Sequence, residues 1–297
     1  MIGLPLPAGV RRQVVPTRHG PVPVLCGQPC HPAPGEVADV VMTSGFFGTK
    51  EDFRELIALL AQAGLRGWAY DYRGQLDPGQ PDQEYTVAGL AGDLRDLMHA
   101  VTGGRPAHVI GHCLGGFAAR SAVLAEPGLA RSLTLLSCGP SMGERKHRAM
   151  LGGLAKLHTN GGTMVLWPLV RKLLADDDTV MREFWRAKLA SMNPRWVTGV
   201  AESLAEEPDR TAELIAAGLP ALVVHGQRDR RLWTPDVYAD LAGRLRADRV
   251  VIDRASHSAN MEQPGPTAAA LLEFWAALGP VARPGPPARP EPAAVRR

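Results

Sequence analysis

Short apolar runs alternate with longer amphipathic stretches along most of this chain, and this alternation limits the folds open to it. The runs predict buried strands at 38–44, 66–72, 106–112, 132–138, 220–226 and 248–254. The stretches predict helices at 51–64, 86–104, 113–124, 235–245 and 267–278. Strands that alternate with helices become parallel neighbours covered on both faces. We therefore predict an α/β fold with a mostly parallel sheet flanked by helices, preceded by two short strands at 11–15 and 21–25.

The alternation stops between residues 141 and 218. Only helical patterns remain there, with breaks at Gly161-Gly162, Asp176–Asp178, Asn193-Pro194 and Pro208. We interpret 141–218 as a helical cap inserted into a core made of 1–140 and 219–279. Residues 280–297 are rich in proline and arginine, and their small apolar area predicts a disordered tail. A chain of 297 residues fits one domain with an insertion.

The net charge of +3 does not indicate a nucleic-acid partner. Residues 281–297 hold four arginines and one glutamate, so the rest of the chain carries 29 basic and 29 acidic residues. Because this balanced part shows no basic face or stripe, we expect no binding to nucleic acid.

The sequence also lacks the marks of secretion or membrane insertion. The N-terminal segment has no basic region followed by a long apolar run, and no segment reaches eighteen consecutive apolar residues. Four cysteines in a chain of this length do not form a disulfide framework. We therefore expect a cytoplasmic protein with no membrane association, in a compartment that keeps a reactive thiol reduced.

The segment Gly-His-Cys-Leu-Gly-Gly at 111–116 is the strongest chemical signal, since it follows a predicted strand and opens a predicted helix. This is the G-x-S-x-G nucleophile elbow with Cys113 in the serine position. The elbow holds its central residue in a strained turn whose crowding only glycine neighbours tolerate. The N-terminus of the following helix favours a thiolate. The alternative is a buried structural cysteine in a glycine-rich turn.

A nucleophile of this kind needs a base and a group that orients the base. Asp229 follows the predicted strand 220–226, and His257 lies in the loop after the strand 248–254. We predict Cys113, His257 and Asp229 as the catalytic residues. The other candidates for the orienting acid are Glu144, Asp236 and Asp253. Alternatively, Asp229 is an ordinary turn residue without a catalytic role.

A tetrahedral intermediate also needs donors for its oxyanion. One donor is expected to be the backbone N–H of Leu114, directly after the nucleophile. The other is expected from the loop 44–48, at the backbone N–H of Phe46.

From Val40 to Pro264 the chain resembles the α/β-hydrolase superfamily, in its lidded branch of epoxide hydrolases, haloperoxidase-like esterases and thioesterases. Five segments carry the resemblance: SGFFG followed four residues later by Phe53, the D-x-R-G turn at 71–74, GHCLGG, HGQRD at 225–229, and His257 with the H-x4-E-x-P ending at Pro264. The resemblance implies an α/β-hydrolase fold with an inserted helical cap. It also implies an enzyme that needs no cofactor.

Two residues depart from the pattern of that branch. Ser44 stands where the branch usually has histidine, and Cys113 stands where it has serine. Cysteine elbows resemble those of dienelactone hydrolases, polyhydroxyalkanoate synthases and some carrier-protein thioesterases.

Cysteine as nucleophile favours particular substrates. A tetrahedral intermediate expels the group of lower pKa, and a thiol leaves far more readily than an alkoxide. Ordinary esters therefore revert, whereas thioesters and, in part, enol esters do not. We predict acyl transfer, cyclisation or hydrolysis of an acyl thioester, a small-molecule substrate carried by CoA or an acyl carrier protein.

The alternatives are hydrolysis of activated esters or lactones, a catalytically silent binder, and a lyase or isomerase on the same scaffold. As candidate substrate-binding residues we include aromatic and polar side chains near the predicted elbow, loop and cap: Phe47, His112, Trp167, Trp185 and Trp233. Helical spacing also suits a packing role for the cap tryptophans, and a structural role for His112. Cys26, Cys30 and His31 lack a second pair of ligands, so we predict no metal site.

Overall fold

The computed structural model describes residues 4–29, 37–75, 85–171 and 179–279. The predicted disordered tail, the pair Cys30 and His31, and the predicted break at Asp176–Asp178 lie outside the described residues. Within the described ranges, each helix is too short or too polar to cross a bilayer.

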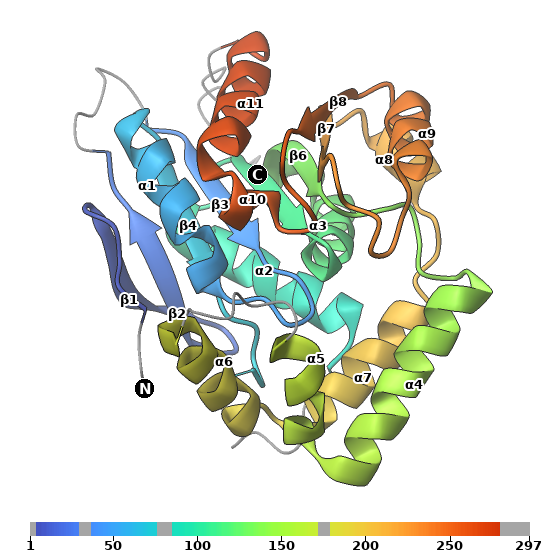
Figure 1. The fold of residues 1–297 in the computed structure, drawn as a ribbon. Helices are drawn as coiled ribbons and strands as arrows, with labels where there is room; N and C mark the ends of the chain where they lie inside the picture. Colours follow the sequence, from blue (N-terminus) through green and yellow to red (C-terminus); the bar gives the residue numbers. More distant parts are fainter. Residues whose placement is uncertain (1–3, 30–36, 76–84, 172–178, 280–297) are drawn as a thin grey trace, which may run out of the picture.

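Eight strands of the described chain form one sheet, in the order β1-β2-β4-β3-β5-β6-β7-β8 (Figure 1). The β1–β2 hairpin and the β2–β4 pair are antiparallel, and every other neighbouring pair is parallel. The prediction of a mostly parallel sheet is confirmed. The strands are β1 Val10–Thr17, β2 Gly20–Gly27, β3 Asp39–Thr43, β4 Arg66–Tyr70, β5 Ala107–His112, β6 Ala130–Leu136, β7 Ala221–Gly226 and β8 Asp248–Ile252.

Helices cover both faces of this sheet, which explains why the central strands β3 and β5 are buried at every position. Successive residues of a strand point to opposite faces. Accordingly, Val109 of β5 joins the core beneath one set of helices, and its neighbour Ile110 joins the core beneath the other. One set is α1 (Arg54–Gln62) and α11 (Pro264–Ala277). The other is α2 (Val87–Thr102), α3 (Leu114–Ala125) and α9 (Pro235–Leu245).

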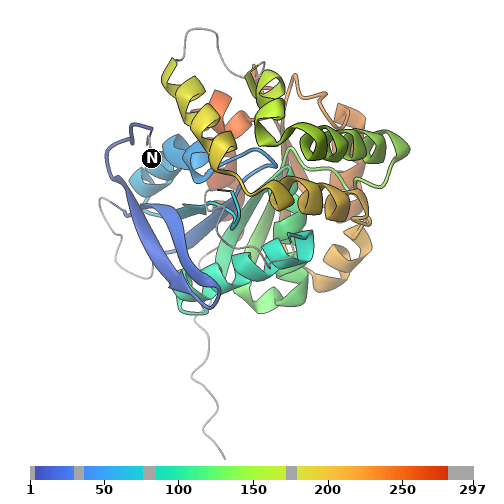
Figure 2. The same ribbon diagram turned by 90° about the horizontal axis from the view of Figure 1, so that it is seen from below.

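Between β6 and β7 the chain forms α4 (Arg145–Gly161), α5 (Trp167–Arg171), α6 (Thr179–Ser191), α7 (Pro194–Ala205) and α8 (Thr211–Ala217). Helices α4 to α7 gather at one end of the sheet (Figures 1 and 2). The helix ends have local causes. Gly162 takes φ 70° directly after α4, and the Asn193 side chain accepts a hydrogen bond from the Arg195 N–H at the start of α7, where Pro194 opens the helix.

The last helix begins three residues before the predicted 267. Proline suits the first turn of a helix because the missing N–H would have no partner there, so Pro264 begins α11. A four-residue helix that the sequence pattern did not predict, α10 (Ala259–Glu262), precedes it. It carries the chain from the loop of His257 into α11.

Candidate active site

Cys113 lies in the sharp turn between β5 and α3, with φ 52° and ψ −113°. A positive φ is unfavourable for a residue with a side chain, so the surrounding packing must hold this conformation. The glycines of the turn make that packing close. A Cβ on Gly111 would lie 2.4 Å from the Gly115 carbonyl oxygen, and a Cβ on Gly115 would lie 2.3 Å from the Thr43 carbonyl oxygen. The turn therefore depends on glycine at both positions.

His257 and Asp229 meet beside this turn, although 28 residues separate them in the chain. The Nδ1 atom of His257 lies 3.2 Å from Oδ1 and 3.1 Å from Oδ2 of Asp229. The buried carboxylate also accepts hydrogen bonds from the Tyr238 hydroxyl at 2.9 Å and the Arg231 N–H at 3.2 Å. Burial raises the pKa of Asp229, but the hydrogen bond and charge of His257 and the Tyr238 hydroxyl outweigh it and lower the pKa to about 2. Asp229 is thus an anion at neutral pH.

The other side of the His257 ring faces the sulfur. Burial lowers the pKa of His257, but the negative charge of Cys113 and hydrogen bonds to Asp229 and Cys113 raise it to about 9. The imidazole is therefore positively charged at neutral pH, between a carboxylate and a sulfur.

The backbone around His257 is held by two side chains. Glu262 accepts hydrogen bonds from the N–H groups of Ser256 at 2.8 Å and Ser258 at 3.1 Å. The Nε2 atom of His112 donates to the His257 carbonyl oxygen at 2.9 Å, and burial lowers the pKa of His112 to about 3, so this ring is neutral. Sequence reasoning noted Glu262 in the H-x4-E-x-P ending without giving it this role.

The loop Ser44–Gly48 lies against the turn at Cys113. A Cβ on Gly45 would be 3.4 Å from the Cβ of Cys113. The Gly45 carbonyl accepts from the Gly48 N–H at 2.9 Å, and because a trans peptide points its C=O and N–H in opposite directions, this bond sets the direction of the Phe46 N–H. Among the described residues, neither the Phe46 N–H nor the Leu114 N–H donates a hydrogen bond. Both groups are thus available to an incoming oxygen.

Two further contacts fix the loop from the side of the sheet. The Tyr72 hydroxyl donates to the Ser44 carbonyl at 2.8 Å, and the Gln75 side chain donates to the Phe46 carbonyl at 3.4 Å. The Ser44 hydroxyl itself makes no hydrogen bond within the described chain. Neither Tyr72 nor Gln75 was singled out from the sequence.

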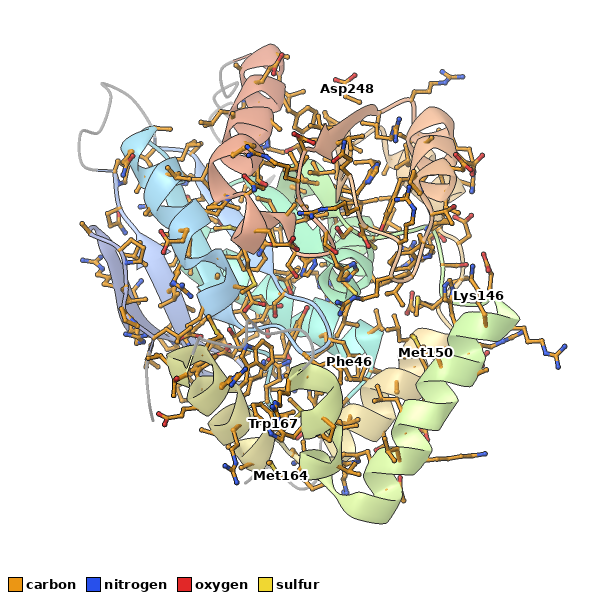
Figure 3. The ribbon with its side chains drawn as sticks, in the orientation of Figure 1. Phe46, Lys146, Met150, Met164, Trp167 and Asp248 are labelled. Carbon is orange, nitrogen blue, oxygen red and sulfur yellow. The ribbon has the colours of Figure 1, made fainter. Side chains whose placement is uncertain are left out.

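The predicted substrate-binding residues occupy different environments. His112 and Trp233 are 5% and 1% exposed, and Trp233 packs on Phe117 with ring centroids 6.1 Å apart. Phe47 lies in the loop Ser44–Gly48, Trp167 begins α5 and Trp185 lies in α6. Phe47 and Trp167 are half-buried, whereas Trp185 is buried. Figure 3 shows Trp167 among the helices α4 to α7. The contacts of His112 and Trp233 are those of packing residues, and substrate binding by all five stays a prediction.

The other acids considered lie away from His257. Asp253 pairs with Arg254 on the surface, and exposed Glu144 pairs with Lys146 in front of α4. Asp236 lies in the first turn of α9. Among the described residues, Asp229 is the one of these four acids that contacts the His257 imidazole.

Metal ligands do not gather in the described part of the chain, where no group of three or more histidine, cysteine or acidic side chains could hold an ion. Cys26 is buried in β2 and accepts a contact from the Gln28 amide at 3.3 Å. The described surface has a cavity of about 440 Å³ between α2 and α7, lined in part by Thr86, Thr198 and Glu202. Cys113, His257 and Asp229 are not among its lining residues.

The fold defines the class of protein: an enzyme of the α/β-hydrolase type. The model of the alpha/beta hydrolase family matches residues 40–270, and the chain belongs to this family.

Relatives and solved structures agree with this assignment. The chain is 32% identical over 131 residues to the proposed carbamate hydrolase RutD of Variovorax paradoxus (strain S110), a match that covers 44% of this chain and 48% of RutD. The chain thus spans about half the length of this curated relative. Its fold is similar to a thermophilic esterase from Thermogutta terrifontis (22% identity, 90% and 99% of the two chains, TM-score 0.72). It is also similar to the enol-lactonase from Burkholderia xenovorans LB400 (19%, 89% and 100%, TM-score 0.71).

Proposed function

We propose that this hydrolase transfers acyl groups through a covalent intermediate on Cys113, with His257 as acid and base and Asp229 as the group that orients His257. The observation that carries the proposal is the position of the His257 ring, which is hydrogen-bonded to Asp229 and close enough to Cys113 for that residue to raise the pKa of the imidazole. The strained turn at Cys113 supports it, because such strain occurs where a side chain must be presented for chemistry.

In the first half of the reaction, the Cys113 thiolate attacks the acyl carbon. The carbonyl oxygen becomes an anion, which the N–H groups of Phe46 and Leu114 stabilise as a preorganised pair of donors. The intermediate then expels the leaving group, which takes the proton from the His257 imidazolium. The acyl group is left on the sulfur as a thioester.

In the second half, neutral His257 takes a proton from the acceptor. The acceptor attacks the acyl carbon, the Cys113 sulfur leaves as a thiolate, and the thiolate–imidazolium pair is restored. Water as acceptor gives hydrolysis, and an alcohol or amine gives acyl transfer or cyclisation.

We favour acyl thioesters of CoA or a carrier protein as substrates. A thiol has an ordinary pKa of about 8.5, whereas an alkoxide is roughly seven pKa units more basic. An intermediate formed from a simple ester therefore returns mostly to the starting ester, and one formed from a thioester does not. A nucleophile of this kind also needs a reducing compartment such as the cytoplasm.

The second candidate is hydrolysis of activated esters or lactones. The similarity to an enol-lactonase favours it, because an enolate is a better leaving group than an alkoxide. The similarity to RutD adds activated carbamates to the compounds worth testing.

Intact-mass measurement tests the proposal. The purified chain is incubated with acyl-CoA, acyl carrier protein, enol esters, lactones and simple esters, and the mass added to the protein is followed with time. We expect one acyl group on the wild type and on Cys26→Ala, and none on Cys113→Ala. Rapid turnover that survives Cys113→Ala would overturn covalent catalysis, and rapid turnover of simple esters with no thioester-derived adduct would overturn the substrate class.

A further inference from the structure

Lys188 of α6 reaches from the cap helices to the loop Ser44–Gly48. Its ammonium donates hydrogen bonds to the carbonyl oxygens of Phe47, at 2.9 Å, and Gly48. The residue is 2% exposed, and its Nζ lies 4.9 Å from the ring centroid of Trp185. Lysine is seldom fully buried without partners, so this placement implies that the contacts to the loop offset a considerable desolvation cost.

Acidic groups near Lys188 supply negative charge, but their own hydrogen bonds go to other partners. The acidic groups that face it are Glu51 and Asp52 of the 3-10 helix Lys50–Phe53, and Asp71 after β4. Asp52 is engaged with the N–H and hydroxyl of Thr49, both at 3.1 Å. Asp71 accepts from the N–H and the ammonium of Lys50. Within the described chain, the hydrogen bonds of Lys188 therefore go to backbone carbonyls of the loop.

With Lys188 included, the four consecutive carbonyl groups from Gly45 to Gly48 all accept hydrogen bonds. Gly45 accepts from the Gly48 N–H, Phe46 accepts from Gln75, and Phe47 and Gly48 accept from Lys188. Because each peptide unit is planar, fixing the carbonyl of one residue also fixes the direction of the N–H of the next residue. The Phe46 N–H is the proposed oxyanion donor, so the hold on this loop bears on the reaction.

We propose that Lys188 is a positioning residue, which keeps the Phe46 N–H directed at the reacting centre by holding the carbonyls of Phe47 and Gly48. The inference rests on the proposed function, and it assigns to α6 a contribution to the oxyanion site. The Ser44 hydroxyl takes no part in holding the loop. Lys188 holds the loop from α6.

The charge of Lys188 makes this hold sensitive to pH. Burial lowers the pKa of Lys188 to about 8, and the charge of Lys50 acts in the same direction. The charges of Asp71, Asp52 and Glu51 oppose this shift only in part. A charged donor makes shorter and stronger hydrogen bonds than a neutral amine. The hold is therefore strong below pH 8 and weakens as the pH rises through 8.

Two rates on Cys113 separate loop positioning from a general loss of structure. Acylation by an activated thioester develops an oxyanion, whereas alkylation by iodoacetamide needs the thiolate alone. In Lys188→Met, which keeps most of the apolar stem, we expect acylation to fall roughly 10- to 100-fold and alkylation to stay within about twofold of wild type. The control is Lys156→Met, on the exposed surface of α4, with both rates unchanged.

The ratio of acylation to alkylation cancels the thiolate fraction. Loss of the His257 proton, with a pKa of about 9, lowers the ratio in both proteins, so the difference between their pH profiles reports on Lys188. We expect the ratio to fall through pH 8 in the wild type and to stay level in Lys188→Met until the pH approaches 9. Equal loss of both rates, an unchanged ratio, or the same pH dependence in both proteins would overturn the inference.

Hydrogen exchange of the Gly48 N–H tests the hold without any catalysis. We expect roughly tenfold faster exchange in Lys188→Met, and unchanged exchange would overturn the inference. If the wild type forms no acyl adduct, the proposed function fails, and the exchange measurement still decides whether Lys188 holds the loop.

Discussion

Replacing Gly48 with alanine tests whether the shape of the loop Ser44–Gly48 sets the rate of acyl transfer. Gly48 is buried, and a Cβ at this position would lie 2.7 Å from the Cβ of Ser44 and 2.8 Å from both Asp52 Oδ2 and the Gly45 nitrogen. Ordinary contact begins at 3.4 Å. The ends of the loop must therefore separate by about 0.7 Å, the difference between 3.4 and 2.7 Å, before alanine fits.

This displacement is large on the scale of catalysis. Overpacking of a buried site costs about 1–3 kcal/mol of stability, and a misplacement of about 1 Å costs up to 100-fold in rate. We expect Gly48→Ala to lower the free energy of unfolding by about 1–3 kcal/mol and to slow acylation of Cys113 roughly 10- to 100-fold. Urea unfolding gives the first quantity. Rapid quenching followed by intact-mass measurement gives the second.

Gly92 provides a matched control for the same substitution. It lies within α2, and a Cβ there would meet no atom within 4 Å. Alanine is the better helix former, so Gly92→Ala should stabilise the protein by about 0.5–1 kcal/mol and leave acylation unchanged. If Gly48→Ala acylates at the wild-type rate, the shape of this loop does not control the oxyanion site and the reasoning is refuted.

Three further predictions follow from the contacts around the site. Tyr238→Phe removes a hydrogen bond to the Asp229 carboxylate, so the pKa of Asp229 rises and the free energy of unfolding falls by about 1–3 kcal/mol; NMR titration and urea unfolding measure these changes, and an unchanged pKa contradicts the prediction. Glu262→Gln loosens the loop of His257 and should slow acylation roughly tenfold, which the intact-mass assay checks against an unchanged alkylation rate. Burial raises the pKa of Asp52 to about 6, although neighbouring groups offset part of the effect of burial. The contribution of Asp52 to stability is therefore present below about pH 4 and is lost as the pH rises through 6. Asp52→Asn should remove up to about 3 kcal/mol of this pH dependence, and identical unfolding profiles for the two proteins would contradict the prediction.

Much of the architecture could be predicted because the central strands are short runs of mostly apolar residues. The runs 106–112 and 220–226 lie within one residue of β5 and β7, and the α/β-hydrolase fold and family are confirmed. Less regular segments were missed. The four-residue helix α10 has no periodic pattern of its own, and the start of α11 at Pro264 depends on a rule about proline at helix ends.

The sequence also indicated some residues of the candidate site and gave no sign of the contacts of others. Cys113, Asp229 and His257 could be singled out from the sequence because each follows a strand, and the carboxyl ends of parallel strands lie at one edge of the sheet. Their catalytic role stays a prediction. Tyr238, on the helix after Asp229, carries no local mark of its contact with the carboxylate. Glu262 belongs to a recognisable ending, but its bonds to the backbone of the histidine loop depend on how that loop turns.

The order of strands and helices, the family, and the residue types available for catalysis were determined by the sequence alone, because apolar periodicity and the glycine-rich turn are local properties. The burial of Lys188 against the loop Ser44–Gly48 was decided only by the tertiary structure, since 140 residues separate its ammonium from Gly48. The charge on His257 was decided there too. A pKa depends on the distances to other charges and to water, and only the folded chain sets those distances.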